Sequence, residues 1–585
     1  MEQSVDVVDL VSSLLDSGKY KEALSVPNDE KYVNSFKDNC WDLISVVIGK
    51  IQDDTIVIKP SLYGTCEELL AMIIQKSAPE EALLEFIEQI ELAKNDAQFS
   101  IILQPLQQLL KKLSAKRGRS LEWCLNSIST YIETIPTPNH QLEGKERLLM
   151  DSDNNVRRIT KVYTLVPPFY TPFIKELDHV DMNINTKQII TAFLISLLGK
   201  PLIHIDLDPD SNGMSEARQA CTTIIQDICI LEKDILKFLV LIEVCYKESH
   251  KTKSKASDDE DERTPYENRD KINMTTLSGL FYCVFSGHFQ IPEAALPQVY
   301  SNEYVVHTTM LSVVHLLSCP EYGPLAKAIS LCKALLNRFS SNITHSLPVP
   351  SVHYDLIKSL VNIAIYSSFE SIRKNAVKLI GSHISKFDFK ARCMLIKYLL
   401  DIANHSGMIG YAITLYKNSI DEAFNNDKLP ECFTGAQLMN MIKKICYLPH
   451  GAESDMVELA DQIITALNFL RYLAIKDTEN ATGIRDCFST IETDYLEKLR
   501  TGLNMSKAHY EVKLKDIEEE KNQPEGKIEV SINVGGNILD KIPTENKKEI
   551  VNSALNAFHL IEGLVARLSE CININKLQGL TMDVQ

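Results

Sequence analysis

The chain has 585 residues, a formal net charge of −17, and 45 % hydrophobic and 24 % charged residues. This composition predicts a packed interior and excludes wholesale disorder, and the acidic balance argues against a nucleic-acid binder, which needs clustered Lys and Arg. The 22 glycines and 22 prolines make up about 7.5 % of the chain, against roughly 12 % on average. Such scarcity favours long helices over sheets, which need many turn residues.

Targeting and membrane signals are missing from the sequence. The segment MEQSVDVVDL carries acidic residues where a secretory signal would carry basic ones. No run of about 18 uncharged apolar residues occurs, so we expect no membrane insertion. Fourteen cysteines are scattered without any CxxC pair. We therefore expect reduced, core-forming cysteines in a cytoplasmic protein.

Helical signals begin near the amino terminus and come in pairs. Thr65 with Glu68, and Ser77 with Glu80, have the spacing of a capping box, which predicts two helices that start at these positions. Two amphipathic helices with a short polar joint form a hairpin, and such hairpins bury their apolar faces by stacking on neighbours. The pattern predicts a helical-repeat array.

Two windows are similar to HEAT repeats. DSDNNVRRI, residues 151–159, resembles the turn into the second helix of a repeat, and IRKNAVKLIG, residues 372–381, resembles that helix itself. One predicted helical face collects Phe369, Ile372, Ala376, Ile380 and His383. We therefore favour a HEAT-like superhelix over a compact bundle.

Two low-complexity breaks interrupt the helices. Residues 247–271 run from lysines into a block of acids and predict a flexible, solvated insertion, with a phosphoregulated or docking segment as the less favoured alternative. Further on, Ile528, Val530, Ile532 and Val534 alternate before Gly535-Gly536, which predicts a β-hairpin.

The expected fold class is therefore all-α, a HEAT-like helical-repeat superhelix with a small β-hairpin insertion near the C-terminus. The expected segments are N-terminal helical repeats over 1–246, the charged insertion over 247–271, middle HEAT-like repeats over 272–402 and C-terminal HEAT-like repeats over 403–585.

Motifs for catalysis, phosphate binding and metal binding are not found. The Asp206, Asp208 and Asp210 spacing starts like a calcium loop, but Ser211 and Ala217 stand where such a loop needs Gly and Glu. We expect a protein without enzymatic activity, cofactor or metal.

A possible binding face lies on the predicted helix that contains LNFLRYLAIK. At about 100° per residue, Phe469, Tyr472 and Lys476 fall opposite an apolar stripe. An exposed aromatic pair beside a cation is a common hot-spot composition. An equally favoured alternative is that this second face packs against a neighbouring helix.

Several blocks, dense from about residue 404 to residue 567, resemble the glomulin family. They include LPHGAESDM from Leu448, LNFLRYLAIKDTENATG from Leu467 and GLNMSKAHYE from Gly502. The resemblance implies a HEAT-like regulator without catalytic activity, whose C-terminal repeats bind the RING-box subunit of cullin–RING ubiquitin ligases. It further implies that the bound protein masks the RING surface that recruits the ubiquitin-conjugating enzyme and so inhibits ubiquitin transfer.

Within that region we expect the RING-binding residues on the predicted helix face and in the GLNMSKAHYE run, which is predicted to be a connection. The amino-terminal half could rigidify the array, engage the cullin or hold another partner. A helical-repeat scaffold or adaptor for another signalling complex is the alternative function. The candidate RING-binding residues are Phe469, Arg471, Tyr472, Lys476, Leu503, Met505, Lys507, His509 and Tyr510.

Overall fold

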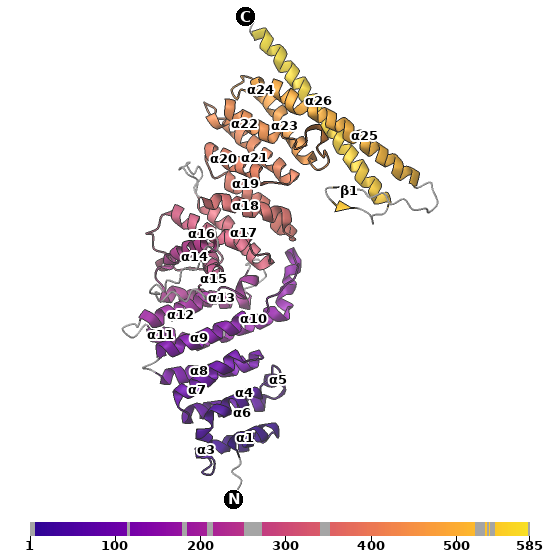
Figure 1. Cartoon of the computed structure of the whole chain (residues 1–585). Coiled ribbons are helices and arrows are strands. Elements are labelled where there is room, and N and C mark those ends of the chain that lie inside the picture. Colours follow the sequence, from indigo (N-terminus) through magenta and orange to yellow (C-terminus); the bar gives the residue numbers. More distant parts are fainter. Residues whose placement is uncertain are drawn as a thin grey trace, which may run out of the picture. The chain divides into compact units, whose positions relative to one another are not determined.

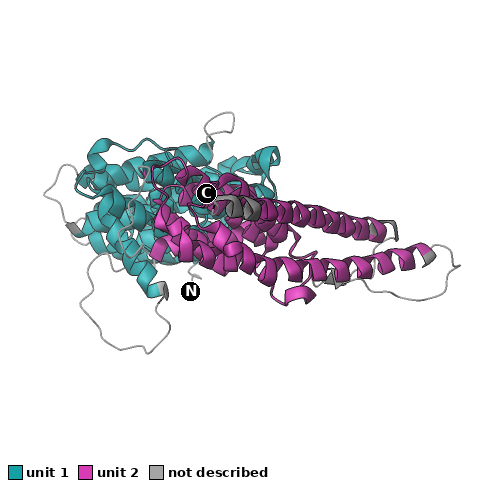
Figure 2. Ribbon diagram, turned by 90° about the horizontal axis from the view of Figure 1, so that it is seen from above, with its two compact units in different colours: residues 1–338, 368–372 teal, residues 339–367, 373–585 magenta. Residues whose placement is uncertain are grey.

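The computed structural model describes residues 6–113, 117–177, 184–207, 215–250, 272–339, 351–520, 533–534, 537–538 and 544–582. The chain divides into two compact units (Figure 2). Unit 1 comprises residues 1–338 and 368–372, and unit 2 comprises residues 339–367 and 373–585. The four predicted segments stay predictions.

Unit 1 is built from helices α1 to α17. The helices are α1 Val7–Asp16, α2 Tyr20–Ser25, α3 Val33–Asp38, α4 Cys40–Gly49, α5 Thr55–Ile58, α6 Pro60–Lys76, α7 Pro79–Glu91, α8 Asp96–Lys112, α9 Arg117–Glu133, α10 Asn154–Leu165, α11 Pro167–Leu177, α12 Ile184–Ser196, α13 Glu216–Leu231, α14 Leu239–His250, α15 Met274–Phe285, α16 Asn302–Leu317 and α17 Tyr322–Arg338. The described 3₁₀ turns of this unit are η1 Val26–Asn28, η2 Gly144–Ser152, η3 Leu202–His204, η4 Ile235–Phe238 and η5 Glu293–Ala295.

The helices of unit 1 stack in two rows, as the predicted hairpins require. One row runs α4, α7, α9, α12 and α15, and the other runs α6, α8, α10 and α13, with each helix contacting the next in its row (Figure 1). Apolar side chains such as Leu83, Phe86 and Ile90 of α7 are buried between the rows. The prediction of an all-α helical-repeat fold is confirmed.

Unit 2 continues the helical pattern with α18 to α26. The helices are α18 Ser351–Tyr366, α19 Glu370–Ile384, α20 Phe389–Ile402, α21 Ser406–Ala423, α22 Gly435–Ile445, α23 Ala460–Lys476, α24 Ile484–Ile491, α25 Glu497–Glu520 and α26 Thr544–Met582, with short turns η6 Glu431–Phe433 and η7 Gly451–Glu453 and the π-helical turn η8 Glu492–Leu496. Here α23 lies between α21 and α26, and α25 packs against α26 and η7. The long pair α25 and α26 is evident in Figure 1.

Helix starts were predicted with mixed success. Asp153 caps α10, because its carboxylate accepts hydrogen bonds from the backbone N–H groups of Asn155 and Val156 at 2.8 and 3.0 Å. The capping boxes predicted at Thr65 and Ser77 are wrong. Helix α6 already begins at Pro60 and α7 begins at Pro79, because proline suits the first turn, where no helical N–H is needed.

The predicted β-hairpin insertion is wrong. Among the described residues the strands reach only two residues each, β1 Asn533–Val534 and β2 Asn537–Ile538, paired antiparallel as Asn533 with Ile538 and Val534 with Asn537. A two-stranded ribbon is marginal in water unless a third strand or a helix covers its apolar face. The alternating residues 528–532 and Gly535-Gly536 lie outside the described residues, as does most of the 247–271 segment, whose first four residues end α14.

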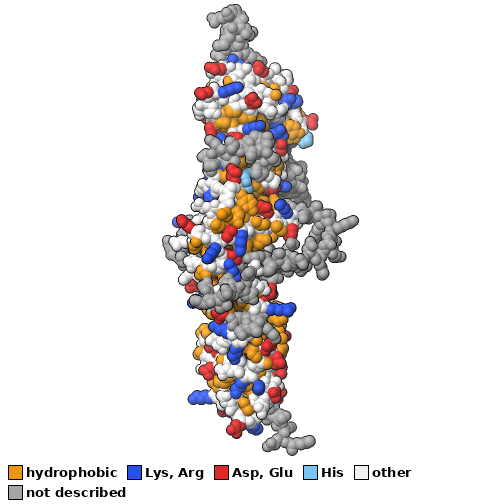
Figure 3. All heavy atoms as spheres, turned by 90° about the vertical axis from the view of Figure 1, so that its left-hand side faces the viewer, with side chains coloured by type: hydrophobic (Ala, Val, Ile, Leu, Met, Phe, Trp, Pro, Cys, Tyr) orange, Lys and Arg blue, Asp and Glu red, His pale blue; other side chains and the backbone are white. Residues whose placement is uncertain are grey.

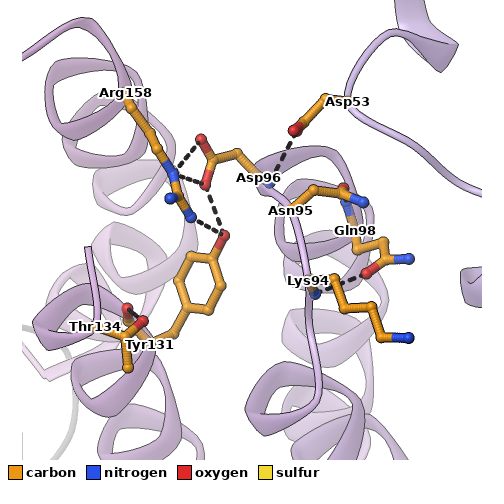
Figure 4. Close-up of polar contacts among 8 residues, drawn as sticks. All are labelled: Asp53, Lys94, Asn95, Asp96, Gln98, Tyr131, Thr134 and Arg158. Carbon is orange, nitrogen blue, oxygen red and sulfur yellow. Dashed lines mark hydrogen bonds and ion pairs between the residues drawn. The ribbon is translucent and has the colours of Figure 1, made fainter. Parts of the chain in front are cut away.

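A buried polar cluster joins three helices of unit 1 (Figure 4). The Asp96 carboxylate at the start of α8 accepts hydrogen bonds from Tyr131 Oη of α9 at 2.6 Å and from Arg158 Nε of α10 at 2.8 Å. The Tyr131 ring stacks on Phe99 with 4.2 Å between ring centroids. Because Asp96 is only 7 % exposed, this charge requires its partners, and the cluster fixes how α8, α9 and α10 pack.

Candidate protein-interaction surface

Phe469 lies in the core of unit 2. It is fully buried, and its ring lies 5.6 Å from that of Tyr416 of α21. Of the two alternatives for this helix face, packing against a neighbouring helix holds for Phe469, and its exposure is wrong. The physical reason is that α23 has helices on two sides, α21 and α26, so that a second face of α23 is also used for packing.

The neighbouring candidates on α23 are partly or fully accessible. Tyr472 is half-buried and donates a hydrogen bond to Asp421 Oδ1 of α21, while Lys417 Nζ lies 4.9 Å from the ring centroid of Tyr472. Burial and the nearby Asp421 carboxylate raise the pKa of Tyr472. Lys476 is exposed at the end of the helix.

Arg471 is also half-buried. Its Nε is enclosed and has no hydrogen-bond partner among the described residues. This side chain therefore keeps a donor that a bound partner could use, although Nε itself is reached only after a local rearrangement.

The GLNMSKAHYE run is helical, and its prediction as a connection is wrong. It lies within α25, where Leu503 and Tyr510, two helical turns apart, are 2 % and 8 % exposed. Tyr510 packs edge-on against Phe558 of α26 with 5.4 Å between ring centroids. These two apolar side chains hold α25 in place because its amphipathic face needs a neighbour.

The opposite side of α25 presents an apolar stripe to solvent. Met505 and Val512 are 53 % and 56 % exposed, and His509 is exposed between them. Their spacings of four and three residues put all three on one face, which we call the α25 stripe. Val512 was missed from the sequence, although its distance of seven residues from Met505 would have indicated it.

Lys507 lies on the side of α25 that faces α26, away from the stripe. Its ammonium group lies 3.1 Å from Glu562 Oε2 of α26, in a half-buried ion pair. The structure thus brings Met505 and His509 together on the α25 stripe, whereas Lys507 lies on the opposite side of the helix. The α23 group does not join them, because Tyr472 faces α21 whereas α25 borders the α26 side.

A second feature of unit 2 was not predicted. A hollow of about 380 Å³ lies between α22 and the η8–α25 segment, with Tyr447, which is 60 % exposed, at its lining. Lys443 and Lys498 also line it, together with the apolar Ile442 and Leu448. The only signal for it in the sequence is that Leu448 begins LPHGAESDM, one of the blocks that resemble the glomulin family.

The surface view shows charged and hydrophobic side chains side by side. On the face drawn in Figure 3, basic and acidic side chains are interspersed, and hydrophobic side chains gather in patches between them. Within the described residues, no group of three or more His, Cys, Asp or Glu side chains could hold a metal ion. Nor does any helix found there have the length and apolar character needed to cross a bilayer.

Comparison with known proteins identifies the family of the chain. The model of an uncharacterised protein family described as YAP/Alf4/glomulin matches residues 37–228 and 325–541, which is more than half of the chain. The chain belongs to the YAP/Alf4/glomulin family. The matched residues include every candidate on α23 and α25, whereas the 247–271 segment and the whole of α26 fall outside the match.

Within the YAP/Alf4/glomulin family, full-length relatives can be aligned. Human glomulin is 27 % identical over 576 residues, which cover 96 % of this chain and 92 % of the human protein. Mouse glomulin is 27 % identical over 581 residues, with the same coverage of both chains. The sequence resemblance to glomulin is confirmed and extends across almost the whole chain.

Solved structures similar to this member of the YAP/Alf4/glomulin family have low scores. A structure of Kap121p bound to Pho4p gives a TM-score of 0.20 at 11 % identity, over 96 % of this chain and 60 % of that chain. A structure from work on the interaction between cadherin and beta-catenin gives 0.23 at 10 % identity, over 98 % and 97 %. TM-scores this low do not indicate a shared overall fold with either structure.

Proposed function

We propose that this protein binds the RING-box subunit of cullin–RING ubiquitin ligases and masks the surface that recruits the ubiquitin-conjugating enzyme. The proposal rests on the relationship to glomulin over 96 % of the chain. The α25 stripe supports it, because Met505 and His509 lie in the GLNMSKAHYE block that resembles the glomulin family and Val512 follows it directly. The proposed role needs no catalytic group and no cofactor, and its site of action is the cytoplasm.

Inhibition would follow from competition for one surface. A RING domain that is covered by this protein cannot bind the conjugating enzyme, so ubiquitin transfer falls with the fraction of RING that is occupied. Apolar side chains that are exposed before binding and buried after it supply the driving force. Met505 and Val512 meet this condition, whereas the buried Phe469, Leu503 and Tyr510 would act only by shaping the surface.

The charged candidates would set orientation. Arg471 and Lys476 could face acidic groups of the partner, since charges at the rim of an interface steer association more than they add affinity. Lys507 is already paired with Glu562 of α26 and would act by holding α25 in place. The cullin is a possible second partner. None of these contacts is required for the central proposal.

A ubiquitination assay with the full chain, a RING-box protein and a cullin tests the proposal. We expect the protein to reduce ubiquitin chain formation in proportion to RING occupancy. Unchanged chain formation at saturating protein would reject the inhibitor role and favour the scaffold alternative.

The position of the surface is tested separately with Met505→Asp combined with Val512→Asp. Two charges on the α25 stripe should weaken RING binding about tenfold or more, because each carboxylate would be buried without a partner. Val57→Asp combined with Val299→Asp, at positions that are 83 % and 76 % exposed in unit 1, is the matched control because it adds the same two charges. Equal inhibition by the double variant and the control would move the surface elsewhere and leave the function intact.

A further inference from the structure

Both tryptophans of the chain are partly exposed on one row of unit 1. Trp41 of α4 is 41 % exposed and Trp123 of α9 is 43 % exposed. Helix α7 contacts both α4 and α9, and its Leu84 is 47 % exposed. Large aromatic side chains are usually buried in a monomer, so two exposed indoles on helices that flank a common neighbour indicate an interaction surface.

The contacts that α4 and α9 make with α7 place the two indoles at similar positions along the axis of α7. Ser127 of α9, one turn after Trp123, donates a hydrogen bond to Glu91 Oε1 at the end of α7 at 2.8 Å. Trp41 interacts with the carboxylate of Glu85 in the middle of α7. Both indoles therefore lie beside the central turns of α7, one on each side.

The strip between the indoles is acidic. Glu81 and Glu88 are exposed on the same face of α7 as Leu84, and Asp42 is exposed next to Trp41. Burial, together with the like charges of Glu88 and Asp42, raises the pKa of Glu85. The carboxylates thus crowd one another, and cations brought by a partner would relieve that repulsion.

Trp123 already makes a cation–π contact within the chain. The guanidinium carbon of Arg119 lies 5.4 Å from the ring centroid of Trp123, one helical turn away on the same helix. An indole with one side against a cation and 43 % of its surface in solvent can accept a second cation.

We propose that the α4–α7–α9 face of unit 1, comprising Trp41, Leu84, Glu81, Glu88 and Trp123, binds an extended segment of a partner protein that carries two basic side chains. The cations would lie over the two indoles and beside the α7 carboxylates, and an apolar residue between them would cover Leu84. Neighbouring helices are roughly 8–10 Å apart, so the indoles are separated by roughly 16–20 Å. At about 3.3 Å per residue, the two basic residues should be about five or six positions apart.

Intrinsic tryptophan fluorescence of the full chain reports on this face directly, because the chain has only these two tryptophans. The probe is a Gly–Ser peptide with two arginines about six positions apart. We expect a saturable change in emission that weakens as salt is added, because the contacts are partly ionic. A flat titration, or an equal response to the peptide with glutamines in place of the arginines, would overturn the proposal.

Matched variants separate a specific face from general charge attraction. Glu81→Gln with Glu88→Gln should weaken peptide binding about tenfold, whereas Glu293→Gln with Glu431→Gln, which removes the same charge from two exposed positions elsewhere, should not. Equal weakening by both pairs would overturn the proposal. Trp41→Phe and Trp123→Phe should each leave a response from the remaining indole, and a response confined to one indole would overturn the two-point contact.

The chain's own basic segment, from Lys247 to Lys255, is the alternative occupant of this face. Deleting residues 249–271 tests whether it occupies the face. We expect the deletion to leave peptide affinity unchanged. A gain in affinity with a change in the emission of the free protein would assign the face to the chain's own segment and overturn the partner proposal.

Discussion

At the scale of single residues, the most unusual side chain is Lys327 of α17. It is 4 % exposed, and its Nζ donates hydrogen bonds to the backbone carbonyl oxygens of Ile203 and Ile205 at 2.8 and 2.6 Å. Burial lowers the pKa of Lys327 to about 8, against 10.5 for an exposed lysine, although the nearby Asp206 acts in the opposite direction. Nothing in the local sequence of α17 indicates this, because the two carbonyls lie more than a hundred residues earlier.

The lowered pKa of Lys327 makes stability depend on pH. Between pH 8 and 10.5 the unfolded chain binds more protons at this site than the folded chain, so the free energy of unfolding rises with pH. From pH 7.5 to 9.5 the contribution of this group should grow by about 2 kcal/mol. Urea unfolding monitored by tryptophan emission measures it, because both tryptophans lie in unit 1 with Lys327.

Lys327→Met is the comparison for this measurement. The variant should be less stable than the parent at both pH values, because two buried carbonyl oxygens lose their donor. The gap between variant and parent should widen at the higher pH. A constant gap would show that Lys327 does not titrate in this range.

At the scale of elements, the α25 helix shows how packing decides what a sequence pattern leaves open. Gly502 looked like the start of a connection, yet it lies inside α25 at a close approach to η7. A Cβ at this position would come within 2.2 Å of Met456 Cε and 2.6 Å of the Ala452 carbonyl oxygen. Gly563 of α26 is also within a helix, but nothing lies within 4 Å of the corresponding position.

The two glycines provide a matched pair of substitutions. Gly563→Ala should stabilise unit 2 by about 0.5–1 kcal/mol, because alanine favours the helix. Gly502→Ala gains the same helix preference but should lose about 1–2 kcal/mol overall, since the methyl group overpacks the contact with η7. Thermal unfolding monitored by circular dichroism measures both, and equal melting temperatures for the two variants would contradict the close approach.

At the scale of the whole molecule, the reactivity of the cysteine thiols reports how well the two units bury them. All fourteen cysteines lie in the described part of the chain, none of them forms a disulfide there, and seven are buried. Burial raises the pKa of Cys66 and of Cys332 to about 12. A thiol reagent reacts with the thiolate, so these groups should be nearly inert in the native protein.

A thiol titration follows from this. The native chain should react slowly and incompletely, and the denatured chain should yield fourteen thiols without added reductant, because the structure contains no disulfide. Fewer than fourteen thiols after denaturation would reveal a disulfide.

Local sequence alone determined the helical class, the turn into α10 and the buried face of α19. Phe369, Ile372, Ala376, Ile380 and His383 are all buried, as their spacing predicted. These features depend on hydrogen bonds and periodicity within one helix, so residues that are close in the sequence determine them. The membership in the YAP/Alf4/glomulin family was also recognisable from short blocks of sequence.

Only the tertiary structure decided which side chains face solvent. Spacing on one helix placed Phe469 opposite the apolar stripe, but α21 and α26 enclose both sides of α23, so that face is core. The same lack of information about neighbours hid the α25 stripe, the Lys327 site and the two exposed indoles. Periodicity reports how a helix is divided into faces, whereas the number of helices packed around it decides how many of those faces are buried.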